Sequence, residues 1–410
     1  MKVFVFVYFK LFCLKNFIFI FHYFSGVSWD AMLKFNGVKL QKITDIRILL
    51  FIELGIRGGV SQVCNRYARA NHPYMQEDFN PEESIKYLYY FDGNNLYGWA
   101  MSQYLPFGGF KFVENPENLD IHNISDESDI GYIFEVDLDY PDSLHDDHKD
   151  LPFCPQHMKP PGSRQVKLMT TLHHKKNYVI HYRALKQALK NGLQLKKIHR
   201  ALQFNQSPWL KQYIDLNTRL RQQATNEFEK NNYKLMNNAI YGKTIENTRK
   251  HVDVKLVGRW DLRYGAENYI AKPNFRNLSI FDENFVAIQL ERTEVKMDKP
   301  IYVGLSVLDL SKTLMYRFHY EFMKPKVGDN LKLLYMDTDS FIYETTDNDI
   351  YKVIKENINE FDTSDFAENN QFGIPRANKK VLGLMKVCCQ MHLSFNRNKL
   401  INFISFLFAG

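Results

Sequence analysis

Two carboxylates, Asp337 and Asp339, lie within the short polar segment Asp337-Thr338-Asp339-Ser340, between the mainly apolar runs 331–336 and 341–343. Apolar runs on both sides of turn-forming residues predict a β-hairpin with both carboxylates at its tip. Two carboxylates held this close repel, and one of them tends to take up a proton. A divalent cation removes that conflict, and Mg²⁺ prefers oxygen ligands and binds substrate phosphates. The alternative is an ordinary solvated turn.

A third carboxylate, Asp92, ends an aromatic-rich run at residues 87–91 that predicts a strand. Gly93, Asn94 and Asn95 then let the chain turn, and backbone amides in such a turn can face phosphate oxygens. Tyr97 follows five positions after the carboxylate, where its ring could line a sugar pocket. Taken alone, this segment equally fits a buried strand followed by a polar loop.

A third group comprises Lys230, Lys234, Asn238 and Tyr241, spaced i, i+4, i+8 and i+11 on a helix predicted to begin near Trp209. This spacing places the four side chains on one helical face. Like charges at i, i+4 disfavour a helix slightly, and a bound polyanion would relieve that cost. Lysines can bind a triphosphate and the tyrosine can stack on a base. The alternative is a solvated basic stripe.

In this order, the three segments resemble motifs A, B and C of family B DNA polymerases. The correspondences are residues 92–98 with motif A, 234–242 with motif B and 335–340 with motif C. Asn95, Gly98 and Ala239 depart from the general pattern, and none of them is a metal ligand there. The sequence of residues 92–103 is similar to that of the protein-primed polymerases of phages, adenoviruses, mitochondrial linear plasmids and Polinton/Maverick transposons. The transposon group is the most similar of these. The resemblance covers about residues 28–386 and suggests a truncated copy.

The resemblance implies a template-directed DNA polymerase that adds deoxynucleotides to a primer 3′ end by two-metal-ion nucleotidyl transfer. Asp92 and Asp339 would hold two Mg²⁺ ions, with Mn²⁺ as an alternative, and Asp337 would support them. The implied nucleotide-binding residues are Asn94, Asn95, Leu96, Tyr97, Lys230, Lys234, Asn238 and Tyr241, with Tyr97 excluding a ribose. Arg57, Gly58 and Gly59 resemble a Gly-Gly motif that contacts DNA. The implied partners are primer–template DNA, deoxynucleoside triphosphates and a terminal priming protein.

The resemblance also implies an α+β right-hand fold with an antiparallel palm sheet and helical fingers. Acidic residues before Gly55 are too few for a proofreading site, so we expect the exonuclease domain to be absent and the thumb to be absent or incomplete. Residues 131–140 are expected to form a further palm strand, and residues 178–182 a strand followed by a helix over 183–190. The expected divisions are an atypical apolar segment 1–27, a linker region 28–86 from the lost exonuclease, palm 87–200 with an insertion, fingers 201–260, palm 261–386 and an atypical tail 387–410.

The whole-chain composition is compatible with this interpretation. The chain has 410 residues, enough for two or three domains, and a formal net charge of +7 that suits a polyanionic partner. Five cysteines are too few for a disulfide framework, which favours an intracellular compartment without distinguishing nucleus, cytoplasm or mitochondrion. Lys10 and Lys15 interrupt the apolar N-terminus before it reaches the roughly 20 residues of a spanning helix, so no membrane partner is expected.

Two competing functions remain open at this point. A catalytically inactive, truncated remnant would at most bind nucleic acid. A reverse transcriptase would also use a palm hairpin, but such enzymes usually carry adjacent aspartates there, whereas Thr338 separates the two in this chain.

Overall fold

The computed structural model describes residues 17–346, 349–388 and 394–396. They form helices and mainly antiparallel sheets, which confirms the predicted α+β class. The chain divides into two compact units. Unit 1 contains the residues up to Thr244 and from Ile301 onward, and unit 2 contains Ile245–Pro300. Residues 1–16 of the apolar N-terminal segment, and most of the expected tail 387–410, lie outside the described residues.

The largest sheet of unit 1, which we call the palm sheet, has six strands in the order β1-β13-β14-β3-β16-β15. Only β15 and β16 pair in parallel; every other neighbouring pair is antiparallel. The strands are β1 (Ser61–Val63), β3 (Lys86–Gly93), β13 (Leu331–Asp337), β14 (Ser340–Thr346), β15 (Phe361–Asp362) and β16 (Met385–Cys388). The predicted hairpin is therefore confirmed as β13 and β14, and the aromatic strand as β3. Strand β16 crosses the expected boundary between palm and tail at residue 386.

A long helical segment packs on the palm sheet. It runs through α10 (Ile301–Tyr316), the π-helical turns η5 (Arg317–Met323) and α11 (Lys324–Val327). Phe318 of η5 packs edge-on against Phe91 of β3, with ring centroids 5.7 Å apart, and stacks on Phe341 of β14 at 6.1 Å. All three rings are buried. Burial on both faces explains why residues 87–91 of β3 and 341–343 of β14 are continuous apolar runs rather than alternating ones.

A second sheet of unit 1 has the order β4-β9-β5-β8. Its strands are β4 (Leu105–Phe112), β5 (Ile130–Asp139), β8 (Lys175–His181) and β9 (Gln194–Ser207), and helix α6 (Tyr182–Lys190) follows β8. The strand expected at 131–140 and the strand and helix expected at 178–190 are confirmed. The assignment of the first of these strands to the palm sheet is wrong, because β5 pairs along its length with the long strand β9.

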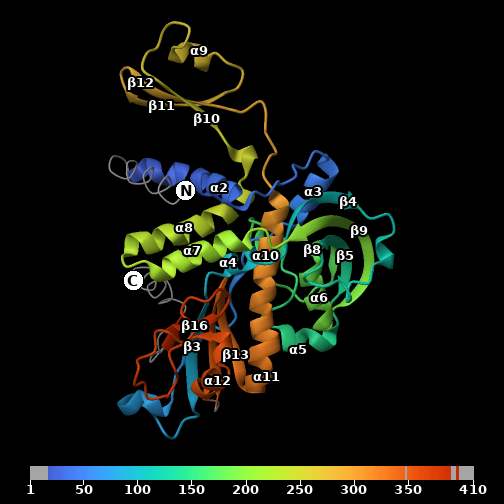
Figure 1. Ribbon diagram of the computed structural model, residues 1–410, viewed down its shortest axis with the longest axis vertical. Coiled ribbons are helices and arrows are strands. Elements are labelled where there is room, and N and C mark those ends of the chain that lie inside the picture. The colour runs from blue at the N-terminus through green and yellow to red at the C-terminus, as the bar shows by residue number, and fades with distance from the viewer. Residues whose placement is uncertain (1–16, 347–348, 389–393, 397–410) are drawn as a thin grey trace. The chain divides into compact units, whose positions relative to one another are not determined.

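The expected single helix beginning near Trp209 is two helices, α7 (Lys211–Gln223) and α8 (Glu227–Thr244). The break begins at Ala224, whose backbone is extended, and the side chain of Asn226 then accepts a hydrogen bond from the Glu229 amide at 2.9 Å. An asparagine in that role starts a new helix. Figure 1 shows α7 and α8 side by side near α2 (Phe17–Asn36), and α8 also contacts α4 (Leu96–Met101).

The remaining elements of unit 1 are short or peripheral. The helices are α3 (Ile46–Gly55), α5 (His145–His148) and α12 (Ile350–Glu356), and the 3₁₀ turns are η1 (Pro73–Asp78), η2 (Pro116–Asn118), η3 (Asp142–Leu144), η6 (Gly328–Asn330) and η7 (Ile358–Glu360). Strand β2 (Tyr67–Arg69) pairs with β17 (Ser394–Asn396), and β6 (Gln156–Met158) pairs with β7 (Lys167–Met169). Among the described residues, no helix is both long and apolar enough to cross a bilayer.

Unit 2 is a three-stranded antiparallel sheet with the order β10-β12-β11. Its elements are η4 (Thr248–Lys250), β10 (Asp253–Val257), α9 (Ala266–Ile270), β11 (Phe275–Asp282) and β12 (Phe285–Leu290). A small core of Val257, Ala266, Val286, Ile288 and Leu290 holds it together. The expected boundary between fingers and palm at residues 260 and 261 falls inside this unit. Most of β11 is exposed, so the sequence there lacks the alternation that predicts a strand.

Candidate active site

The palm sheet brings Asp92 and Asp339 to its same end. Strand β3 pairs with β14 so that Asp92 lies opposite Ser340, and the amide of Gly93 donates to the carbonyl oxygen of Asp339 at 2.6 Å. Asp337 ends the neighbouring strand β13. The three carboxylates predicted from separate motifs therefore meet at one edge, because the hairpin register and the β3–β14 register agree.

The electrostatics of this edge are those of two carboxylates that repel each other. Burial raises the pKa of Asp92, while the charges of Lys234 and Lys386 act in the opposite direction. Burial and, next, the negative charge of Asp92 raise the pKa of Asp339 to about 7. Strongly shifted acids at a shared site are typical of functional groups.

Two carboxylates suit a cation that completes its coordination from other sources. In the part of the chain that the structure describes, no three His, Cys, Asp or Glu side chains form a ready-made metal cluster. Asp337 instead accepts hydrogen bonds within its own hairpin, from the Tyr335 hydroxyl at 3.2 Å and the Thr338 hydroxyl at 3.4 Å. Mg²⁺ commonly takes one or two carboxylates and fills its other positions with water and substrate phosphates. The donor set of Asp92 and Asp339 fits that ion.

The turn after β3 is held from several sides. Asn95 adopts a left-handed conformation, with φ 43°, and its side chain accepts from the Gly98 amide at 3.2 Å to begin α4. A Cβ atom at residue 98 would lie 2.3 Å from the Asn95 side chain. The two departures from the general motif A pattern are therefore coupled, since the capping asparagine requires the glycine. Leu96 is buried beneath this turn.

One expectation about this turn is wrong. The amide of Asn94 was expected to face a triphosphate, but it donates to the carbonyl oxygen of Leu384 at 2.9 Å. Its side chain is also engaged, because Nδ2 donates to Asp362 Oδ2 at 2.7 Å. Asn94 therefore fixes the turn in place, and its own amide is not available to a phosphate.

Helix α8 brings the expected basic residues to the same region. Lys234 is exposed, and its positive charge acts on both Asp92 and Asp339. Lys230 forms an ion pair with Glu227 at 2.6 Å. Four residues beyond Lys234 along the helix, Asn238 is exposed. Lys230 is paired with an acid on its own helix. Lys234 is therefore the principal cation of α8 that acts on the carboxylates.

The two tyrosines of the candidate nucleotide site meet directly. Tyr97 of α4 and Tyr241 of α8 stack with ring centroids 4.3 Å apart and an interplanar angle of 17°. Offset stacking of this kind contributes about 0.5–1.5 kcal/mol beyond simple burial. The pair joins the helix after Asp92 to the helix that carries Lys234, and half-burial of both rings leaves part of this aromatic surface open.

The Gly-Gly segment contacts the β13–β14 hairpin rather than presenting a cation. Arg57 is only 8% exposed, donates to the Val179 carbonyl at 2.7 Å and stacks on Tyr178 at 3.8 Å. The expected DNA contact of Arg57 is therefore wrong, because its guanidinium is held inside the protein. A Cβ atom at Gly59 would lie 2.3 Å from the Thr338 hydroxyl, whereas one at Gly58 would meet nothing within 4 Å.

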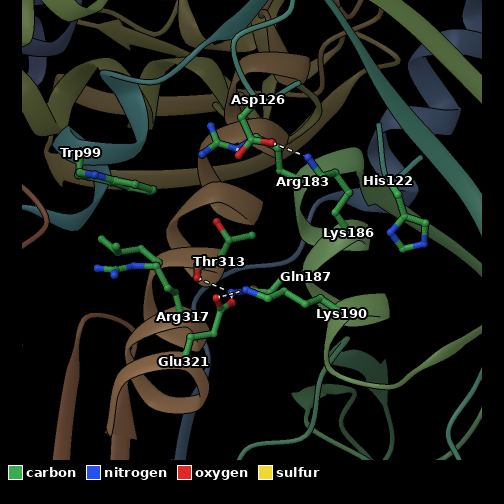
Figure 2. A pocket seen from close by; sticks show the side chains of 11 residues that line it. Trp99, His122, Asp126, Arg183, Lys186, Gln187, Lys190, Thr313, Arg317 and Glu321 are labelled. Atoms are coloured by element: carbon green, nitrogen blue, oxygen red, sulfur yellow. Dashed lines mark hydrogen bonds and ion pairs between the residues drawn. The ribbon is translucent and has the colours of Figure 1, made fainter. Parts of the chain in front are cut away.

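A separate cavity of about 350 Å³ lies between α6 and the α10–η5 segment. Figure 2 shows its cations turned toward its acids: Arg183 and Lys186 bind Asp126 at 3.0 and 2.9 Å, and Lys190 binds Glu321 at 2.5 Å. None of the predicted site residues lines it. Arg317, which also lines the cavity, pairs with Glu360 outside the lining at 2.8 Å. These cations already have acidic partners, so the cavity does not rival the carboxylate edge as a phosphate site.

Sequence reasoning missed two charged residues at this edge of the sheet, one acidic and one basic. Asp362 of β15 holds Asn94, and Lys386 of β16 lies opposite Asp92 in the register of the sheet. Lys386 also forms an ion pair with Asp365 at 2.5 Å. Neither lies in a recognisable motif, and only the pairing of β16 with β3, across nearly 300 residues of sequence, brings them to the site.

The sequence model of the family described as DNA polymerase type B, organellar and viral, matches residues 74–325. The match covers more than half of the chain and includes Asp92, Lys234 and Tyr241. The chain belongs to this family. No curated protein sequence matches it.

Solved structures of phi29 DNA polymerase are similar in fold to this family member. The orthorhombic crystal form is 16% identical with a TM-score of 0.50, and the alignment covers 88% of this chain and 51% of that one. The complex with primer–template DNA and incoming nucleotides has a TM-score of 0.49, with 16% identity and the same coverage. The chain thus spans about half the length of the phi29 polymerase chains that it matches.

Proposed function

We propose that the chain catalyses template-directed DNA synthesis, adding deoxynucleotides to a primer 3′ end with the help of two divalent cations. The observation that carries the proposal is the half-buried pair Asp92 and Asp339, close to the charge of Lys234 at one edge of the palm sheet in a member of a DNA polymerase family. Bound Mg²⁺ would lower the pKa of the primer hydroxyl and stabilise charge on the leaving pyrophosphate.

In this proposal the chain's own residues mainly position and neutralise the reactants, as phosphoryl transfer requires. Asp92 and Asp339 hold the cations, and Asp337 stiffens the hairpin through its contacts with Tyr335 and Thr338. Lys234 neutralises triphosphate charge. Tyr97, stacked on Tyr241, lines the sugar and nascent base pair, so that a ribose 2′-hydroxyl would collide with its ring.

The proposed partners follow from the same site. Primer–template DNA and deoxynucleoside triphosphates are bound in solved phi29 polymerase complexes, and we propose the same two ligand classes for this chain. A terminal priming protein, which the protein-primed branch uses, remains a prediction for this chain.

Primer extension by the purified chain, with Mg²⁺ and four deoxynucleotides, tests the activity. We expect extension by the wild type and a loss of at least about 10³-fold in Asp92→Asn and Asp339→Asn, because each removes a ligand that stabilises transition-state charge. Lys352→Gln, on the exposed face of α12, is the matched surface control. Equal DNA binding by the wild type and the two aspartate variants, without extension by any of them, would instead identify an inactive remnant.

A further inference from the structure

Residues 378–384 form a loop that is clasped onto the turn after Asp92. The amide of Gly383 donates to the Asn94 carbonyl at 2.9 Å, and the Asn94 amide donates to the Leu384 carbonyl at 2.9 Å. Buried Asp362 completes the clasp, since its Oδ2 accepts from Asn94 Nδ2 at 2.7 Å and from the Lys380 amide at 2.8 Å. This loop lies outside residues 74–325, the part matched by the family, and outside all three motifs.

The clasp holds the backbone of Lys380 in an uncommon conformation. Asn378 and Lys380 have φ values of 59° and 56°. Side-chain hydrogen bonds from Asn378 to the Ile358 and Phe361 carbonyls, at 2.9 and 3.0 Å, support the first residue. Left-handed conformations of non-glycine residues persist where the surroundings enforce them and are frequent at functional sites. The hydrogen bonds of the loop thus hold the backbone at Lys380, and this backbone conformation sets the direction in which its side chain leaves the loop.

The loop also contacts α7, the helix that precedes the one carrying Lys230 and Lys234. Gln222, near the end of α7, donates to the Lys379 carbonyl at 3.0 Å. Lys380 is half-buried, and burial followed by the charges of Arg221 and Lys230 lowers its pKa. The Nε atom of Arg221 is buried without a hydrogen-bond partner among the described residues. The acid that acts on this group, Glu227, is already paired with Lys230 at 2.6 Å. The remaining cations around an unsatisfied donor therefore suit a polyanion.

We propose that Lys380, together with Arg221, forms a second cationic group that binds the phosphates of the incoming deoxynucleoside triphosphate, in addition to Lys234. The inference rests on the proposed function and extends it to a residue outside the polymerase motifs. A nucleotide is favoured over the DNA backbone because the loop is clasped to Asn94, two residues after the carboxylate that would hold the cation.

The test compares Lys380→Gln, Lys380→Gly and Lys380→Arg with the wild type and with the surface control Lys352→Gln. Glycine removes the charge and also suits a positive φ, so it separates the side chain from the backbone conformation. Binding of deoxynucleotide to a complex with a dideoxy-terminated primer is measured with Mg²⁺, because this readout needs no turnover. The KM for deoxynucleotide and the Kd for primer–template follow on extendable primers.

We expect Lys380→Gln and Lys380→Gly each to weaken nucleotide binding about tenfold, to raise KM similarly, and to leave the DNA Kd within about twofold. Lys380→Arg should recover most of the affinity, since it retains the charge. Unchanged nucleotide binding in Lys380→Gly overturns the assignment, as does weaker DNA binding with unchanged nucleotide affinity. A wild type that does not bind nucleotide overturns it as well. Nucleotide binding that depends on Lys380, without extension by the wild type, contradicts the proposed polymerase activity alone.

Discussion

At the residue scale, the closeness of Asp92 and Asp339, which the proposed function needs, lowers the stability of the fold at neutral and high pH. Burial and mutual repulsion hold the pKa of Asp339 at about 7 instead of the usual value near 3.8. Between these two values the folded state binds more protons than the unfolded state, so stability falls as pH rises through this range. Above pH 7 the full cost is present unless a cation offsets it.

We therefore predict that Asp339→Asn raises the melting temperature of the metal-free protein at pH 8 while abolishing extension. Each kcal/mol of relieved repulsion should raise Tm by about 2 °C or less, because the shift is about 2–4 °C for 150–250 residues and falls with chain length. Differential scanning calorimetry with and without Mg²⁺ measures this, with surface Asp329→Asn as the control. A lower Tm in the variant would show that the carboxylate stabilises the fold and does not strain it.

Residue identity predicted the carboxylates but not every neighbour. Asp92, Asp337 and Asp339 could be predicted because the apolar runs and turn residues that identify them are adjacent to them in the sequence. The burial of Arg57 could not, since it depends on Tyr178 and Val179, more than 100 residues away in the sequence. The same reason hid Asp362 and Lys386 from the sequence argument.

At the element scale, the glycine pair and the hairpin act as one assembly. Strand β1 pairs Ser61 with Asp337, and the Thr338 amide donates to the Val60 carbonyl at 2.8 Å. Gly59 lies so close to Thr338 that any side chain there would push the hairpin tip away. A displacement of about 1 Å at reacting groups can cost on the order of 100-fold in rate.

We predict that Gly59→Ala lowers kcat at least about tenfold, whereas Gly58→Ala leaves it within about twofold, because only the first Cβ meets Thr338. The double variant Gly59→Ala/Thr338→Gly should recover activity, since it removes the clash and residue 338 already has φ 49°. Single-turnover extension measures all three. Equal losses at both glycines would mean that the loop matters for its flexibility and not for this contact.

Elements with a local signal were predictable and those that depend on distant pairing were not. The strand before Asp92, the hairpin and the helix carrying Lys234 follow from apolar periods and turn residues. The break at Ala224 could not be predicted, because no glycine or proline marks it in the sequence. Strand β5 reads like any half-buried strand, so its sequence does not say which of two sheets it joins.

At the scale of the whole molecule, buried histidines make unit 1 sensitive to acid. Burial lowers the pKa of His148 to about 4 and those of His181 and His319 to about 3. In the unfolded chain they titrate near 6.5, so below that pH the unfolded state binds more protons and stability is lost as pH falls. Asp339 and Asp92, whose pKa values are raised, act in the opposite direction, but they are two groups against three.

We predict that the urea midpoint of unfolding, measured by circular dichroism on the full chain, falls clearly between pH 7.5 and pH 5.0. His181→Asn should reduce that fall, because asparagine keeps the helix-capping role of His181 without a protonation step. The surface variant His122→Asn is the control, since that side chain is exposed. A midpoint independent of pH would show that the three histidines are accessible to protons in the folded state.

The position of β3 in the middle of the palm sheet also affects how the chain can be made. Its two neighbours, β14 and β16, begin at residues 340 and 385, whereas β3 ends at Gly93. At ribosomal rates of roughly 5–20 residues per second, the aromatic strand waits about 15–60 s before both edges can pair. An apolar strand with two unpaired edges is a template for aggregation. We therefore expect the strand that carries Asp92 to need protection by a chaperone while the chain is being synthesised.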